Sequence, residues 1–153
     1  MAELLRRLCE AVAGRCRVRV IEGLDGSPFL SKYLLAGRAT DGWRLCLHQF
    51  HRGDEDPEPH NHPWWCASLI VVGGYREERL RADGAVVATE LRPGSVNVIG
   101  LDAFHRVDLL DGECWTLFLS APRAQRWGFV DRATRSFVPW REFIARKGMV
   151  PNG

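Results

Sequence analysis

The sequence predicts an all-β fold, a sandwich or a barrel, with a short helix at each end. From Arg17 onward, short segments rich in β-branched and aromatic residues alternate with turn dipeptides such as Asp83-Gly84, Pro93-Gly94 and Asp111-Gly112. No helical pattern separates these segments, so parallel βαβ units are disfavoured. Many short strands joined by tight turns are typical of antiparallel sandwiches and barrels.

The first and last elements are predicted as helices, because the apolar residues of segment 3–13 recur at helical spacing and Gly14 follows them. Near the other end, Pro139 opens a short helix over Val138–Lys147. Between them we expect the following strands: Arg17–Ile21, Trp43–Phe50, Trp64–Val72, Tyr75–Arg81, Ala85–Leu91, Val96–Ile99, His105–Leu109 and Trp115–Leu119.

Length and composition fit one packed domain. The chain has 153 residues, of which 46% are hydrophobic and 26% charged, values that disfavour disorder. We expect one domain over 1–153, with an N-terminal helix at 1–14, a barrel at 17–120 and a C-terminal extension at 121–153.

Charge and cysteine content narrow the class of protein further. The net charge is only +2 and the basic residues are spread along the chain, which argues against a nucleic-acid partner. No run approaches the ~18 apolar residues of a membrane helix, and the first residues carry charges where a signal peptide is apolar. The five cysteines are odd in number and form no CxxC pair. Together these features predict a cytoplasmic protein with reduced thiols.

A histidine pair stands where a charged loop enters an apolar segment, in DEDPEPHNHPWW. Residues two apart in a strand face the same side, so His60 and His62 can aim at one metal ion. Two solvated loop histidines are the plain alternative for this pair. His105 begins a later strand, and a closed barrel can bring it to the same mouth. Three neutral imidazoles suit zinc, iron, nickel or copper and leave coordination positions open.

Here the sequence resembles the cupin superfamily, whose motifs are G(X)5HXH(X)3-4E(X)6G and G(X)5PXG(X)2H(X)3N. His60, His62 and Gly73 keep the first spacing, with Cys66 at the glutamate position and the leading glycine off by one, at Gly53. The second motif keeps its spacing from Gly94 to His105, while Gly100, Asp102 and Leu109 replace its proline, second glycine and asparagine. The resemblance covers roughly residues 43–120 and implies a cupin-type double-stranded β-helix, or jelly-roll, barrel.

The resemblance also implies a mononuclear divalent metal, a homodimer and a small-molecule substrate. With Cys66 in place of the glutamate, the ligand set His60, His62 and His105 looks like that of the thiol dioxygenases, which hold Fe(II) with three histidines. Cysteine dioxygenase has a cysteine near this place that is linked to a tyrosine late in its chain. Neither tyrosine of this sequence lies late in the chain, so we interpret Cys66 mainly as a small core residue, with a substrate-side role as the alternative.

Further candidates lie on neighbouring strands. Glu77 can face inward as a fourth ligand or general base, or outward as a solvated charge, and Tyr75 can move a proton in the same pocket. His48 is either a metal ligand, a residue that supports the ligands, or an ordinary packing residue. It shares a strand face with Arg44, which can pair with a substrate carboxylate. Trp64 shares the predicted face of Cys66 and lines either the core or an apolar pocket.

The leading hypothesis is a non-heme iron dioxygenase acting on a small molecule, with Zn, Ni or Mn as other possible metals. Metal-assisted lyase or isomerase chemistry is the first alternative, and a non-catalytic cupin that binds a small ligand is the second. Fold alone does not choose among them.

Overall fold

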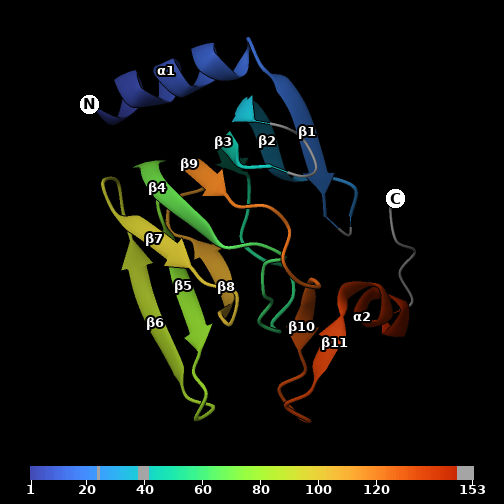
Figure 1. Cartoon of the computed structure of the whole chain (residues 1–153). Coiled ribbons are helices and arrows are strands. Elements are labelled where there is room, and N and C mark those ends of the chain that lie inside the picture. Colours follow the sequence, from blue (N-terminus) through green and yellow to red (C-terminus); the bar gives the residue numbers. More distant parts are fainter. Residues whose placement is uncertain (24, 38–41, 148–153) are drawn as a thin grey trace.

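A computed structural model describes residues 1–23, 25–37 and 42–147 of the chain. These residues form two helices and eleven strands (Figure 1). In chain order they are α1 Ala2–Ala13, β1 Arg17–Glu22, β2 Pro28–Gly37, β3 Arg44–Phe50, β4 Cys66–Val72, β5 Tyr75–Leu80, β6 Val86–Leu91, β7 Val96–Ile99, β8 Phe104–Leu109, β9 Cys114–Ser120, β10 Gly128–Val130, β11 Phe137–Pro139 and α2 Trp140–Arg146. The last six residues of the predicted C-terminal extension lie outside the described part.

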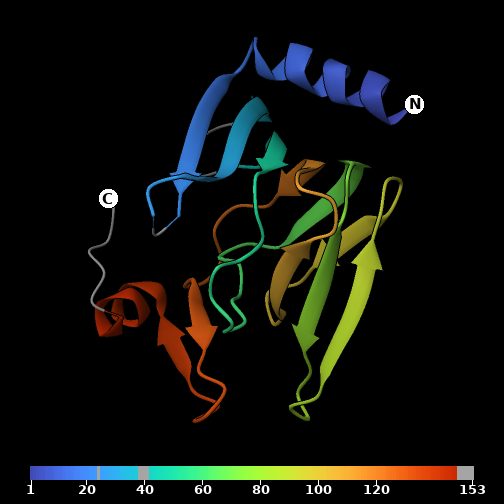
Figure 2. The ribbon, with the colours of Figure 1, turned by 180° about the vertical axis from the view of Figure 1, so that it is seen from behind.

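The strands pair antiparallel in two main sheets, as Figures 1 and 2 show from opposite sides. The larger sheet has the order β1-β2-β3-β9-β4-β7, and the smaller has the order β6-β5-β8. A separate pair, β10 and β11, lies beside α2 at the C-terminal end. Isolated bridges join His60 to His105 of β8 on one side and to Phe129 of β10 on the other. His60 therefore links the smaller sheet to the C-terminal hairpin.

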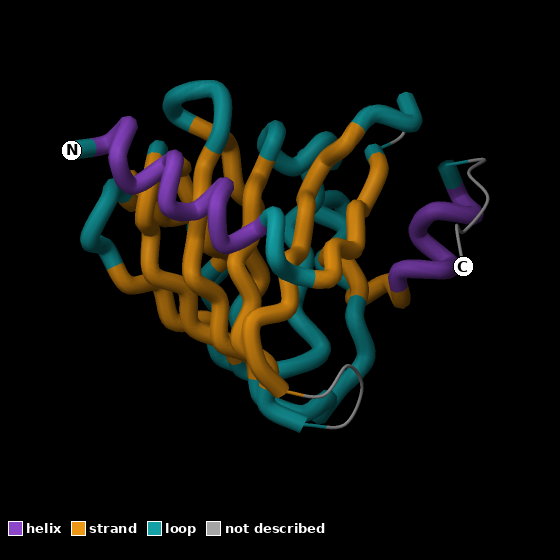
Figure 3. The backbone as a smooth tube through the Cα atoms, turned by 90° about the horizontal axis from the view of Figure 1, so that it is seen from above, coloured by secondary structure: helices purple, strands orange, loops and turns teal. Residues whose placement is uncertain are grey.

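The larger sheet has one face toward α1 and one face toward the barrel interior. Helix α1 lies across the outside of the strands (Figure 3). Its Cys9 and Ala13 pack with Leu47 and Trp115 in one buried cluster. Because side chains alternate along a strand, the neighbours of Leu47 and Trp115 in β3 and β9 face inward.

The interior holds two further apolar clusters. Ile70, Tyr75, Val107 and Cys114 form one of them, and Cys66, Ile99 and Phe118 form the other. Gly73 makes the turn from β4 to β5 with a φ of +71°, and a Cβ there would lie 2.1 Å from the carbonyl oxygen of Glu113. The motif glycine is therefore required by the backbone at this corner.

Truncation of an interior side chain tests this packing. Ile70 is 1% exposed, so Ile70→Val should lower the free energy of unfolding by about 1 kcal/mol through loss of one buried methyl group. Val86→Thr is the control, since that residue is 46% exposed and surface changes alter stability by less than about 0.5 kcal/mol. Urea denaturation measures both. An Ile70→Val variant as stable as the original chain would contradict this packing.

The predicted all-β cupin barrel with terminal helices is confirmed. Each predicted strand is present, with bounds that shift by no more than two residues. Three strands were not predicted, namely β2, β10 and β11. The C-terminal helix begins at Trp140, two residues later than expected, because Val138 and Pro139 belong to β11. Neither helix of the described residues is long and apolar enough to cross a membrane.

Candidate metal centre

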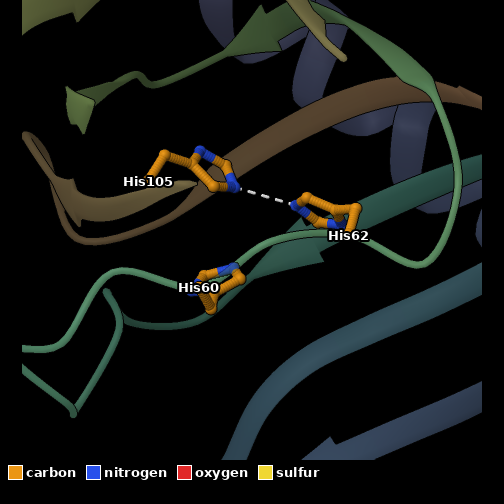
Figure 4. Close-up of side chains that lie close together, drawn as sticks. All are labelled: His60, His62 and His105. Carbon is orange, nitrogen blue, oxygen red and sulfur yellow. Dashed lines mark hydrogen bonds between the residues drawn. The ribbon is translucent and has the colours of Figure 1, made fainter. Parts of the chain in front are cut away.

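His60, His62 and His105 lie together, as Figure 4 shows. One potential ligand atom from each of them lies within 4.8 Å of the other two. His60 and His62 come from the loop before β4, and His105 comes from β8. The backbone of His60 pairs with that of His105 through two hydrogen bonds of 2.9 Å. This pair of backbone hydrogen bonds holds His60 and His105, which are far apart in the sequence, next to each other.

The hydrogen bond between His105 and Glu77 sets the tautomer of the imidazole. Nδ1 of His105 lies 2.6 Å from Oε1 of Glu77. Burial opposes ionisation of Glu77, but hydrogen bonds from His105, Asn97 and Arg79 outweigh it and lower its pKa to about 2. A carboxylate only accepts, so Nδ1 of His105 donates, and in the neutral imidazole, the form that binds metals, Nε2 keeps a free lone pair.

That lone pair points at the second histidine of the cluster. Nε2 of His105 and Nε2 of His62 are 2.8 Å apart, the contact dashed in Figure 4. With His105 in this tautomer, Nε2 of His62 is the donor across the contact. When His62 carries its proton on Nδ1 instead, two lone pairs face the same point. This donor set fits a transition-metal ion, and the structure supports a metal site here.

Burial keeps the two loop histidines of the cluster, His60 and His62, uncharged at neutral pH. Burial lowers the pKa of His60 to about 4, with Asp54 acting in the opposite direction. The pKa of His62 falls well below its ordinary range, chiefly through burial and then through the neighbouring histidines. Neutral imidazole is the form that binds metals, so protons do not compete for these nitrogens at pH 7.

Asn61, between the two loop histidines, anchors this loop to the C-terminal hairpin. Its side chain is 4% exposed, its Nδ2 donates to the carbonyl of Arg126, and its Oδ1 accepts from the amide of Gly128. The two bonds measure 3.1 and 2.8 Å. The side chain thus points away from the metal cluster and holds the backbone that carries it.

Removal of the Asn61 amide should therefore destabilise the fold. Asn61→Ala leaves the buried amide of Gly128 and the carbonyl of Arg126 without their partner, and should lower the free energy of unfolding by about 2 kcal/mol. Asp102→Asn on the nearby surface should change it by less than about 0.5 kcal/mol. Chemical denaturation measures both variants, and equal stability of Asn61→Ala and the original chain would refute the anchoring role.

Cys66 and Tyr75 lie in the barrel interior without joining the cluster. Cys66 is fully buried beside Ile99 and Phe118, and burial raises the pKa of its thiol to about 12. The Tyr75 hydroxyl accepts from Asn97 at 2.9 Å and lies 3.4 Å from the Ser68 hydroxyl. Burial raises the pKa of Tyr75 to about 12 as well, so both groups are protonated at neutral pH.

The remaining sequence candidates line other parts of the interior. His48 is 3% exposed, and its ring stacks on Phe118 at 4.3 Å between centroids. The ring centroids of Phe118 and His62 are 6.4 Å apart, so the ring of Phe118 lies between His48 and the histidine cluster. The Arg44 guanidinium covers the Trp64 ring at 4.3 Å.

Lys32 is the interior residue that sequence reasoning missed. It lies in β2, directly across from His48 of β3. The signal available was an isolated lysine in the apolar stretch PFLSKYLLAG. Leucine has no strand preference, so that stretch was not identified as a strand and its inward side was not assigned.

Comparisons with solved structures place this arrangement among known folds. DMSP lyase DddQ from Ruegeria pomeroyi DSS-3 is similar with a TM-score of 0.59 and 19% identity, over 78% of this chain and 63% of that one. KdgF from Halomonas sp. is similar with a TM-score of 0.53 and 18% identity, over 72% of this chain and 92% of that one. Fe(II)-HppE with its alternative substrate (S)-1-HPP is similar with a TM-score of 0.53 and 12% identity, over 68% of this chain and 56% of that one. This chain therefore spans just over half of the length of HppE.

No family model matches the chain, and no curated protein shows significant sequence similarity to it. At these identities the structural likeness speaks for the fold and not for an activity. The structural neighbours are cupin-fold proteins, and the two histidine motifs of this sequence meet in one cluster. The chain is therefore a protein of the cupin fold with a three-histidine site.

Proposed function

We propose that this protein is a mononuclear non-heme iron enzyme that oxidises a small molecule with dioxygen. The observation that carries the proposal is the cluster of His60, His62 and His105, with the His105 ring oriented by its contact with Glu77. Fe(II) bound by three neutral ligands would offer open positions at which substrate and dioxygen are activated. HppE, a structural neighbour, is an Fe(II) protein by its description, which supports this choice of metal.

In this proposal the chain supplies orientation and exclusion of water. Glu77 accepts from Nδ1 of His105 and so keeps Nε2 free, while Asn97 and Arg79 hold the carboxylate in place. Phe118 and the buried Cys66 form an apolar wall on the other side of the interior. Reactive species formed in such a site are kept from water.

A lyase or isomerase is the second candidate, and the Tyr75 network favours it. Asn97 donates one hydrogen bond to Tyr75 and another to Glu77, so a protonated hydroxyl and an ionised carboxylate lie in one network beside His105. In a lyase, a Lewis-acidic metal would act beside this proton donor and this acceptor. One structural neighbour is described as a DMSP lyase.

Oxygen consumption separates the candidates. The protein is reconstituted with Fe(II) under nitrogen and then moved to aerated buffer. There it should consume oxygen when given a small thiol such as cysteine, and zinc-loaded protein should consume none. A lyase would form product with either metal and without oxygen. Metal binding without any turnover on a broad substrate panel would leave a non-catalytic ligand-binding cupin. The oxygenase proposal fails if iron-loaded protein consumes no oxygen with any substrate.

We also propose a reducing, cytoplasmic location and a homodimer. All five cysteines are free, which fits a compartment without disulfides. Apolar side chains of α1 and of the outer strands, including Leu4, Val96 and Val98, remain exposed and offer a surface for a second copy. Light scattering on the purified protein tests the dimer, and a monomeric mass would refute it.

A further inference from the structure

The interior face of the larger sheet carries a row of polar side chains apart from the histidine cluster. Lys32 of β2 pairs in register with His48 of β3, and His48 pairs with Thr116 of β9. All three are on the face opposite α1, because their neighbours Tyr33, Leu47 and Trp115 pack against that helix. Directly opposite residues have Cβ atoms about 5 Å apart, so the three side chains form a continuous row.

The members of this row lack partners among the residues that the structure describes. Nδ1 of His48 and Oγ1 of Thr116 are buried and make no hydrogen bond. Lys32 makes no hydrogen bond or ion pair with any described residue, and no carboxylate is among the groups whose charges act on it. Buried polar groups in native proteins are almost always satisfied, so the two buried atoms of His48 and Thr116, beside the cation of Lys32, point to a missing ligand.

The charge in this row is positive and weakly solvated. Burial lowers the pKa of Lys32 to about 8, and the nearby cations Arg19 and Arg44 act in the same direction. The ammonium group is still mostly protonated at pH 7. An anion placed against it would be bound more strongly than at the protein surface, since the interior screens charge less.

The row lies within reach of the metal cluster. The ring of His48 stacks on Phe118, and Phe118 contacts the ring of His62. Lys32 is near enough to His62 that its charge adds to the lowering of the pKa of His62, for which burial is the main cause. The row and the histidine cluster therefore lie on either side of the ring of Phe118.

We propose that Lys32, His48 and Thr116 bind the carboxylate of the substrate, with Lys32 as the cation and the other two as neutral donors. This inference names the substrate class of the proposed enzyme and so rests on the proposed function. A planar monoanion with two oxygens matches one cation and two neutral hydrogen-bond donors. The remainder of the molecule then extends past Phe118 toward the three histidines.

The lysine content of the chain allows a direct test. Lys32 and Lys147 are its two lysines, so protein labelled with ¹³C at the lysine side chains gives two sets of signals. Lys147→Met assigns them and is the matched control, since that residue lies at the end of α2. Zinc-loaded protein under nitrogen is titrated with propionate and, separately, with propionamide, which has the same shape without the charge.

The Lys32 signals should shift saturably with propionate and not with propionamide, while the Lys147 signals stay in place. Lys32→Met should weaken propionate binding by about 10-fold or more, and Thr116→Val by about 3-fold, from the loss of a charged and a neutral hydrogen bond. Lys147→Met should bind propionate like the original chain. Circular dichroism and zinc content establish that each variant is folded and loaded.

Equal propionate affinity in the original chain and Lys32→Met overturns the inference, as does an absence of propionate binding to the original chain. Because the titration needs no turnover, it is independent of the oxygenase proposal. Carboxylate binding without oxygen uptake would count against the oxygenase alone. Oxygen uptake without any role for Lys32 would count against the carboxylate site alone.

Discussion

Joint replacement of His60 and His62 by alanine should abolish metal binding. Protein purified without added metal should contain close to one equivalent of a transition metal, and the double variant close to none. Two of the three imidazoles are then missing, and His105, held by Glu77, remains as a single ligand. Elemental mass spectrometry measures the metal content of both proteins.

His51→Ala is the control for this experiment. His51 also lies in the loop region after β3, but its Nε2 contacts Oγ of Ser31 at 2.9 Å and it is outside the cluster. The control should retain its metal. Metal retained by the double variant, or no uptake of iron, zinc, nickel or manganese by the original chain, would refute the metal site.

Replacement of Glu77 by alanine should weaken both the metal site and the fold. Without its carboxylate, Nδ1 of His105 loses its acceptor and the ring loses its fixed tautomer, which should lower metal affinity by about 10- to 100-fold. Asn97 and the partly exposed Arg79 lose a partner as well, so the free energy of unfolding should fall by about 3 kcal/mol. Competition with a chelator and urea denaturation measure the two effects.

Glu78→Gln separates this effect from general loss of charge. Glu78 is the next residue of β5 and faces the other side, where it lies near Arg76, Arg106 and Arg132. Such partly exposed pairs contribute less than about 1 kcal/mol. Metal affinity should stay unchanged in this variant. If Glu77→Ala kept full metal affinity, its contact with His105 would have no role in the site.

The strands that could be predicted were those with a local signal. β4 and β9 are rich in apolar and β-branched residues and are bounded by turns, so pattern alone located them. β2 pairs with two neighbours in a ten-residue strand, yet its leucines carry no strand preference. β10 and β11 have three residues each and are held by tertiary contacts, which a single sequence does not display.

The candidate site divides in the same way. The spacing of His60, His62 and His105 follows a known motif, so their meeting could be expected before the structure. The direction of Glu77 could not, because Glu78 beside it offers the same group to the opposite face of β5. The inward direction of Lys32 could not be predicted either, because it requires β2 to be recognised as a strand. It also requires the register of β2 with β3, which is a long-range property of the chain.

The bridges of His60 tie the metal cluster to the C-terminal hairpin. The amide of Val130 donates to the carbonyl of Pro59, and the amide of Asn61 donates to that of Gly128. An ion bound by the loop histidines would thus favour the same backbone arrangement that keeps β10 in place, and by thermodynamic linkage an ordered hairpin would raise the affinity for the ion. Residues after the barrel proper are in this sense part of the metal-binding unit. Slower hydrogen exchange at the Val130 amide after metal addition would be its observable sign.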